Sequence, residues 1–203
     1  MAQMKTPGVY IIEKNAFPNS VVEVATAIPA FIGHTQFARD GNKDLTGIPF
    51  RISSMAEFHS FFGFAPTLRF GIRPEDSESE DTTNDINVLF PDGSCQLTLP
   101  KTFYALYYNM LLFYANGGGP CYIVSVGDYE HDFKSIDFTN ALLALKKEQE
   151  PTLVVVPEAV YMEEGDCYKV QTAALMHCGN DMKNRFAILD VFNGYKDENG
   201  AVI

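Results

Sequence analysis

Histidine and cysteine side chains are the groups in this chain whose chemistry suits metal binding or nucleophilic catalysis. The set comprises His34, His59, His131, His177, Cys95, Cys121, Cys167 and Cys178. Zinc sites draw ligands from close pairs such as C-x-x-C, and no such pair is present. His177 and Cys178 are neighbours, but adjacent side chains on a helix point about 100° apart. We therefore expect core packing and no metal ion.

A phosphate-binding loop is the second chemistry that the residue types allow, at the glycine-rich run 116–120 (NGGGP). Dinucleotide-binding fingerprints place their glycines between a strand and the helix that follows it. Here the glycines follow an expected helix and precede an expected strand, so no helix N-terminus faces a ligand. The run predicts a helix end and a tight turn. Neither a G-x-x-x-x-G-K-[ST] loop nor a G-x-S-x-G elbow is present.

Asp190 is the third candidate, because it lies near the carboxyl end of an expected strand, where ligands of α/β proteins often bind. In an enzyme it would be a ligand or a base. In a structural protein it caps a turn or pairs with a basic residue such as Arg185. We favour the structural role, and the sequence predicts neither an enzyme nor a cofactor.

The composition excludes several classes of partner. The net charge is -11 and 46% of the residues are hydrophobic, enough for a substantial core. Such an acidic surface disfavours nucleic acid and membrane surfaces. Six acids form a stretch that predicts a solvated loop without calcium-loop spacing: Glu75, Asp76, Glu78, Glu80, Asp81 and Asp85. No apolar run approaches the length of a membrane span, and the start of the chain shows no signal peptide, so we expect free thiols in a reducing cytoplasm.

Strands and helices alternate in the second half of the chain. Strands are expected at 121–126, 152–156 and 185–192, with helices at 138–149 and 167–178 between them. This β-α-β-α-β order predicts an α/β fold, with a mostly parallel sheet and helices on both of its faces. An earlier strand at 27–34 begins the core.

The middle of the chain predicts two helices and an insertion. Ser54 and Glu57 have capping-box spacing at the start of a helix that ends at Gly63. The segment 102–116 is apolar nearly all round, so its helix is either deeply buried or contacts a second surface. Between them, residues 64–100 predict a loop with a β-hairpin insertion, whose strands are expected at 86–90 and 95–99.

The first 26 residues predict an extended N-terminal arm, and residues 27–203 predict the α/β core. Two short β-rich runs, at 9–13 (VYIIE) and 21–24 (VVEV), have no neighbouring run with which to pair. Strands with free edges pair with a sheet in their own chain or in another. At the other end, the last strand has no helix after it to cover the sheet. We therefore expect a fold that is incomplete or depends on other chains.

Five collinear segments match one family pattern. They are TPGVYIIE (6–13), AIPAFIGHT (27–35), RISSMAEFHSFFG (51–63), FYANGGGPCYIVSV (113–126) and RFAILDV (185–191). Together they resemble the N-terminal part of the contractile tail sheath proteins of phages and related injection systems. The resemblance covers most of residues 5–195, and its specificity lies in the order of the segments.

The chain departs from the family pattern at several points. Ser125 occupies a position where arginine is frequent, and Phe192 and Asn193 follow the aspartate where proline is usual. The insertion at about 74–99 lies outside the minimal pattern. Family members usually continue well past residue 203 into a domain near the inner tube and a C-terminal arm. We therefore expect a fragment, a short relative or a sheath that is divided differently.

The resemblance implies a structural subunit that forms stacked hexameric rings around an inner tube and contracts to drive the tube through a target envelope. It implies self-association and contacts with the tube, baseplate and terminal cap proteins, first in the bacterial cytoplasm and then in a tail-like particle. Its inter-subunit arm matches Gly8, Val9, Tyr10, Ile11, Ile12 and Glu13. The alternatives are a sheath-derived baseplate or cap adaptor, a small α/β hydrolase and a nucleotide-binding enzyme.

Overall fold

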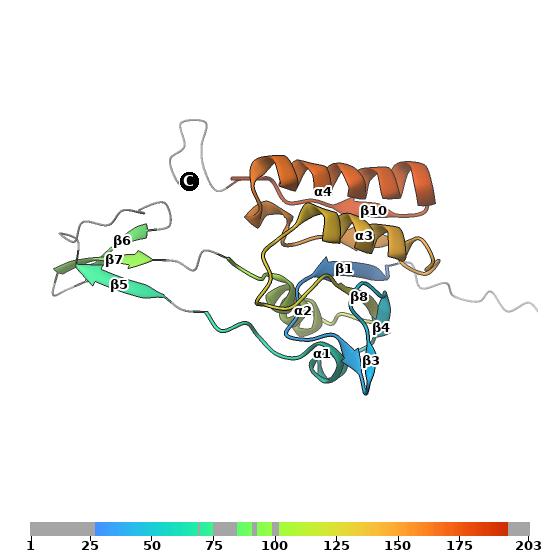
Figure 1. Cartoon of the computed structure of the whole chain (residues 1–203), viewed down its shortest axis with the longest axis horizontal. Helices are drawn as coiled ribbons and strands as arrows, with labels where there is room; N and C mark the ends of the chain where they lie inside the picture. The colour runs from blue at the N-terminus through green and yellow to red at the C-terminus, as the bar shows by residue number, and fades with distance from the viewer. Residues whose placement is uncertain (1–26, 69, 75–84, 91–92, 99–101, 195–203) are drawn as a thin grey trace, which may run out of the picture.

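A five-stranded mixed sheet forms the centre of the molecule (Figure 1). The structure is a computed structural model that describes residues 27–68, 70–74, 85–90, 93–98 and 102–194. The strand order is β10-β9-β1-β8-β4. The strands are β1 (Pro29–Gly33), β4 (Phe50–Ile52), β8 (Cys121–Ser125), β9 (Leu153–Val155) and β10 (Phe186–Ile188).

Four of these strands are parallel, and β4 joins the edge of β8 in the antiparallel direction. All five residues of β1 and of β8 are buried, which explains their continuous apolar sequences. The predicted α/β class with a mostly parallel sheet is confirmed.

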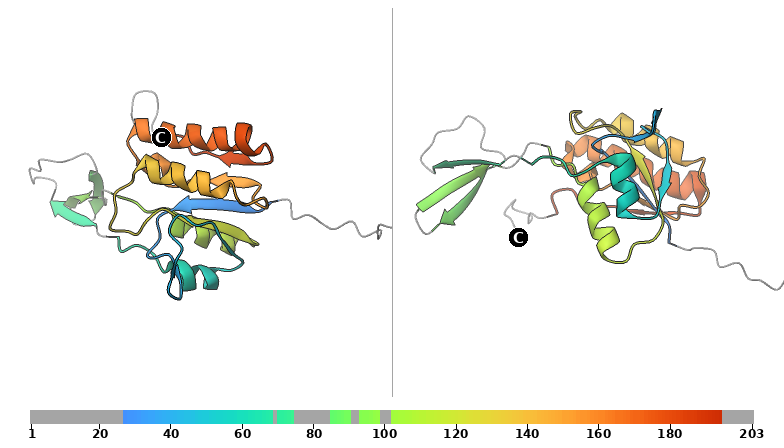
Figure 2. Two further views of the ribbon diagram at one scale, coloured as in Figure 1. Left: turned by 45° about the vertical axis from the view of Figure 1, so that its right-hand side comes forward. Right: turned by 90° about the horizontal axis from the view of Figure 1, so that it is seen from below.

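Two helices cover each face of the sheet (Figures 1 and 2). On one face lie α3 (Ser135–Leu145) and α4 (Glu164–Met176), whose apolar side chains share a core with β1, β8 and β9. On the other lie α1 (Met55–Phe62) and α2 (Leu106–Ala115). The strands therefore sit between two separate apolar layers.

Helix α1 begins where the capping pattern predicts. The Ser54 hydroxyl accepts a hydrogen bond from the backbone N–H of Glu57 at 3.2 Å. The Glu57 carboxylate accepts from the backbone N–H of Ser53, one residue before the cap, instead of from Ser54 itself. Gly63 follows the helix with φ of 87°, a conformation that glycine adopts readily.

Helix α2 has both a buried and an exposed side. Leu106 and Met110 are fully buried, whereas Leu111 and Leu112 are exposed. The helix is thus not buried all round. The exposed leucines are compatible with the other expectation, that α2 contacts a second surface, and that contact stays a prediction.

Two small antiparallel sheets complete the described structure. A short hairpin pairs β2 (Arg39–Asp40) with β3 (Lys43–Asp44). A three-stranded sheet, which projects from the core in Figure 2, has the order β5 (Gly71–Pro74), β7 (Gly93–Thr98), β6 (Asp85–Phe90). The sequence predicted a loop where β5 lies.

The C-terminal elements differ most from the sequence-based expectation. Strand β10 has three residues, so Asp190 lies beyond it and does not end the strand. Helix α4 continues as a π-helix, η2 (His177–Met182), which Lys183 ends with a left-handed φ of 59°. A 3-10 turn, η1 (Ala159–Tyr161), lies between β9 and α4. Among the helices that the structure describes, none has the length and hydrophobicity needed to cross a bilayer.

Candidate functional site

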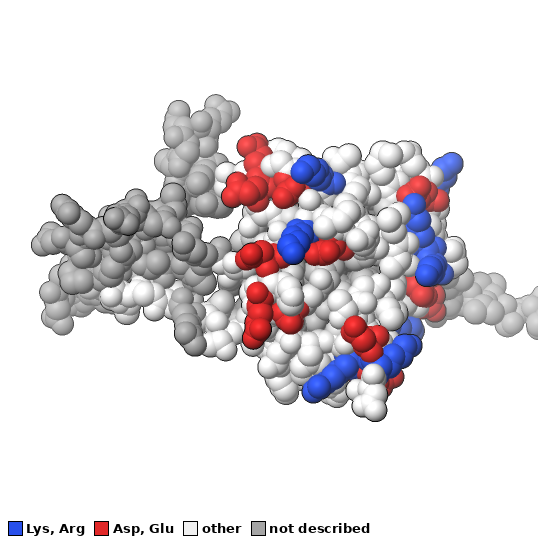
Figure 3. All heavy atoms as spheres, in the orientation of Figure 1, with Lys and Arg blue, Asp and Glu red and all other residues white. Residues whose placement is uncertain are grey.

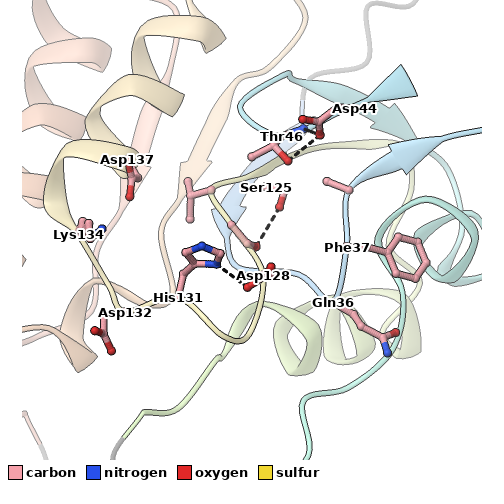
Figure 4. Close-up of a pocket in the computed structure, with 13 residues that line it drawn as sticks. Gln36, Phe37, Asp44, Thr46, Ser125, Asp128, His131, Asp132, Lys134 and Asp137 are labelled. Carbon is pink, nitrogen blue, oxygen red and sulfur yellow. Dashed lines mark hydrogen bonds and ion pairs between the residues drawn. The ribbon is translucent and has the colours of Figure 1, made fainter. Parts of the chain in front are cut away.

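A cleft of about 390 Å³ opens at the carboxyl ends of β1 and β8 (Figure 4). From β1 the chain passes to the layer of α1 and α2, and from β8 it passes to α3 on the opposite face. Two adjacent parallel strands whose connections leave toward opposite faces create the crevice where α/β proteins most often bind ligands. The cleft is therefore the candidate binding or catalytic site.

The cleft is lined mainly by residues from the two loops that follow these strands. These residues are Gln36, Phe37, Ala38, Asp44, Thr46, Ser125, Val126, Gly127, Asp128, His131, Asp132, Lys134 and Asp137. Four carboxylates face one lysine, so the cleft carries negative charge. This charge disfavours phosphate-bearing ligands and favours cations.

Two of the carboxylates are held by local hydrogen bonds. Asp128 accepts from the backbone N–H of Glu130 at 2.9 Å, and its Oδ1 lies 2.5 Å from Nδ1 of His131. The backbone hydrogen bond and then His131 lower the pKa of Asp128. The backbone N–H and the hydroxyl of Thr46 likewise lower the pKa of Asp44. Both groups are therefore anionic near neutral pH.

The Asp128–His131 pair has the appearance of a catalytic dyad but has no nucleophile beside it. The Ser125 hydroxyl is buried, lies 2.6 Å from the hydroxyl of Thr35 and donates to the carbonyl of Gly127 at 3.3 Å. Within the described residues, Ser125 makes no hydrogen bond to His131. Nor does that part of the chain contain three His, Cys, Asp or Glu side chains grouped to hold a metal ion.

Of the other histidines, His59 does not line the cleft. His59 stacks between Phe64 and Tyr107 and lies 3.2 Å from the Tyr107 hydroxyl. Three cysteines are buried and free, and Cys95 is half-buried. Burial raises the pKa of Cys121 to about 11, which leaves it a thiol at neutral pH.

His34 and Glu158 form a buried pair that the sequence did not reveal. Both side chains are almost fully buried, and Nδ1 of His34 lies 2.8 Å from Oε2 of Glu158. Glu158 also accepts the backbone N–H groups of His34 and Leu106. One carboxylate thus joins β1, the loop after β9 and the start of α2. Glu158 follows a proline in a loop, and no spacing rule connects it with His34.

Arg185 performs a role other than the predicted pairing with Asp190. Its guanidinium is buried, donates to the carbonyls of Leu145 and Glu148 at the end of α3, and contacts Nε2 of His177. A cation at this position also interacts favourably with the helix dipole. Asp190 is exposed, and its backbone carbonyl accepts from Gln171. Of the two structural roles expected for Asp190, the pairing with Arg185 was therefore wrong.

The glycine-rich run at 116–120 is a helix end, as predicted. The backbone N–H of Gly117 donates to Tyr114, and that of Gly118 donates to Phe113. These glycines precede β8 at its amino end, whereas the cleft lies at the carboxyl end of the same strand. The run thus contributes nothing to the cleft.

Strand β10 forms an open edge of the sheet. Its neighbour on one side is β9, and no described strand pairs with its other side. Phe186 is 77% exposed and Ile188 is 50% exposed, whereas Ala187 between them packs against the core beneath α3 and α4. The two exposed residues therefore share the opposite face, which the described helices leave uncovered at this strand.

The opposite edge is protected in a way that β10 is not. The exposed residue of β4 is Arg51, which is paired with Glu150 at 3.1 Å. Charged side chains on edge strands discourage the addition of further strands. Of the two edges of the central sheet, β10 is therefore the better acceptor. The predicted arm residues Gly8–Glu13 lie outside the described part of the chain.

Comparison with known proteins adds no family assignment. No protein-family model matches this chain, and no curated protein matches it.

Proposed function

We propose that this chain is a structural subunit of a contractile sheath, which polymerises as stacked hexameric rings around an inner tube and contracts to drive it through a target envelope. Its partners are further copies of itself, the tube protein, and baseplate and terminal cap proteins. It assembles in the bacterial cytoplasm and then forms part of a tail-like particle. The proposal assigns it no enzymatic activity.

The observation that carries this proposal is the edge of β10 that no described strand pairs with, where Phe186 and Ile188 are exposed. An edge of this kind accepts a strand from another chain through main-chain hydrogen bonds, while alternate side chains set the register. The arm segment 9–13 has the β-branched and aromatic composition that such a strand needs.

The positions of the matching segments add support. Four of the five segments that resemble the sheath family coincide with the central sheet and the helices against it, at β1, β4 with α1, α2 with β8, and β10. The fifth is the arm. The segments thus overlap four of the five strands of the central sheet and include the arm that would join it to a neighbour.

The cleft supports a structural role through what its residues do. Its serine is engaged with Thr35 and Gly127, and its Asp128–His131 pair lies at the surface. Hydrolysis would require a nucleophile in contact with that base. This geometry therefore favours an assembly protein over the small hydrolase considered above.

Disulfide trapping between copies tests the proposal. Ile11→Cys is placed on one tagged copy and Ile188→Cys on a second copy with a different tag, and the mixture is oxidised. The account predicts a covalent product that carries both tags. Lys43→Cys, on the β2–β3 hairpin, replaces Ile188→Cys as the control and should give none. A third variant carries both cysteines on one chain. Crosslinking within that chain, together with no product that carries both tags, would contradict donation between subunits.

A further inference from the structure

The two ends of the parallel sheet carry unpaired charge of opposite sign (Figure 3). In that view acidic side chains predominate over the carboxyl ends of the strands, whereas lysine and arginine side chains are mixed with acidic ones over the amino ends. The acids at the carboxyl end that make no ion pair with a described residue are Asp44, Glu130, Asp132, Asp137, Glu163, Glu164 and Asp190. Lys134 is the unpaired cation among them.

Helix dipoles explain only part of this acidic end. Asp137 and Glu164 lie in the first turns of α3 and α4, where negative charge is stabilised by the helix itself. Glu130, Asp132 and Asp190 lie in loops outside any described helix, so no dipole accounts for them. They add negative charge to this end of the sheet.

At the amino end, internal ion pairs leave cations in excess. Lys146 is bound to Asp181 at 2.7 Å, and Arg51 is bound to Glu150. Lys147, just after α3, and Lys183, just before β10, are exposed and make no ion pair with a described residue. Lys147 and Lys183 therefore lie at the amino end of the sheet, which is the end opposite to the cleft. Glu148, next to Lys147, makes no ion pair with a described residue either, so two unpaired lysines stand against one unpaired acid at this end.

We propose that the acidic carboxyl end of one copy docks on the amino end of a second copy, so that Lys147 and Lys183 meet the carboxylates around the cleft. The contact joins unlike surfaces and therefore extends into a stack instead of closing as a dimer. It deepens the self-assembly proposed above and rests on it. The net charge of -11 opposes association in orientations that do not bring these opposite charges together.

The shape of the carboxyl end suits this partner. The cleft of about 390 Å³ is lined by Asp44, Asp128, Asp132 and Asp137, and it is wide enough for a lysine side chain. Its lining has four carboxylates and one lysine, so the cleft requires further positive charge for neutrality. An ammonium group on a flexible stem meets that requirement.

Complementary charge reversal tests the contact. One variant carries Glu130→Lys, Asp132→Lys and Asp190→Lys, and the other carries Lys147→Glu and Lys183→Glu. Each removes one partner surface, so each alone should self-associate about tenfold more weakly than the wild type at low salt. An equimolar mixture should associate again, because the intact end of each variant then meets the other. Sedimentation velocity of the full chain at about 50 and about 500 mM salt measures all three.

Matched controls are Asp40→Lys and Lys43→Glu on the β2–β3 hairpin, which should associate as the wild type does. This contact would be overturned if either reversal variant alone associated as strongly as the wild type, or if the mixture did not associate. If the mixture associates but the wild type forms no sheath-like particles, the contact stands and the proposed function fails. A wild type that is monomeric at low salt overturns both.

Discussion

Glu158 holds His34 twice, since one carboxylate oxygen lies 2.8 Å from both the backbone nitrogen and Nδ1 of the histidine. The other oxygen accepts the backbone N–H of Leu106 at 3.2 Å. These bonds fasten the end of β1 to the start of α2 in a region closed to water. Gly33 permits this approach, because a Cβ there would lie 2.9 Å from Leu106 Cβ and 3.1 Å from Glu158.

Glu158→Ala should therefore destabilise the fold strongly. It leaves the donors at His34 and Leu106 buried without an acceptor, and breaking a buried pair in this way costs about 3–5 kcal/mol. Glu158→Gln keeps one carbonyl oxygen and should cost less, about 1–3 kcal/mol. Urea unfolding monitored by circular dichroism measures both. An alanine variant within about 0.5 kcal/mol of the wild type would show that the pair is not a structural anchor.

The stability of the chain should fall in acid partly through His177. Burial, and then the charge of Arg185, lower the pKa of His177 to about 4. The unfolded chain, with the ordinary pKa of 6.5, therefore binds more protons between these values. The stabilisation is complete above pH 6.5 and is lost as the pH falls toward 4, by about 3 kcal/mol in total.

His177→Gln isolates this effect, because carboxylates contribute to acid unfolding as well. The free energy of unfolding of the variant should change less steeply than that of the wild type between pH 6.5 and 4. His131→Gln is the control, since His131 is exposed beside Asp128. Equal slopes for the wild type and His177→Gln would contradict the buried, uncharged state of His177.

Gly63→Ala should destabilise the chain by more than about 1 kcal/mol. Gly63 has φ of 87°, and a Cβ there would lie 2.5 Å from the Gln36 side chain. Gly165→Ala is the matched control, because Gly165 lies in α4 with open space around it and alanine favours helices. Thermal unfolding should show a lower Tm for the first variant and an equal or higher Tm for the second.

Lysine at Phe186 and Ile188 should block strand addition without unfolding the chain. Both side chains are exposed, so Phe186→Lys with Ile188→Lys removes little buried surface and adds charge to an open edge. Ile136→Lys with Leu143→Lys places the same charges on the exposed side of α3 as a control. Particles counted by electron microscopy should be lost only in the edge variant. Undiminished assembly there would exclude β10 as the acceptor.

Local patterns in the sequence predicted the core well. Continuous apolar runs predicted β1 and β8, and the spacing of Ser54 and Glu57 predicted the start of α1. These features depend on residues that are close together in the sequence. Their types and spacing can be read from one sequence. The parallel sheet followed from the order of the elements.

The details that the sequence missed depend on residues far apart in the chain. Glu158 and His34 are 124 residues apart, and nothing local marks the carboxylate as buried. Pairing with Arg185 was one of two roles expected for Asp190, but the Arg185 guanidinium reaches the end of α3, 40 residues earlier. The cleft likewise forms only when the loops after β1 and β8 meet.

Electron microscopy of the full chain at high concentration, beside a version that lacks residues 1–20, tests the central claim most directly. The account predicts ringed tubes or sheath-like cylinders for the full chain and their loss on truncation, with the circular dichroism spectrum of the core retained. A full chain that remains a monomer under these conditions, or a truncated chain that assembles equally well, would contradict a sheath subunit joined by a donated arm.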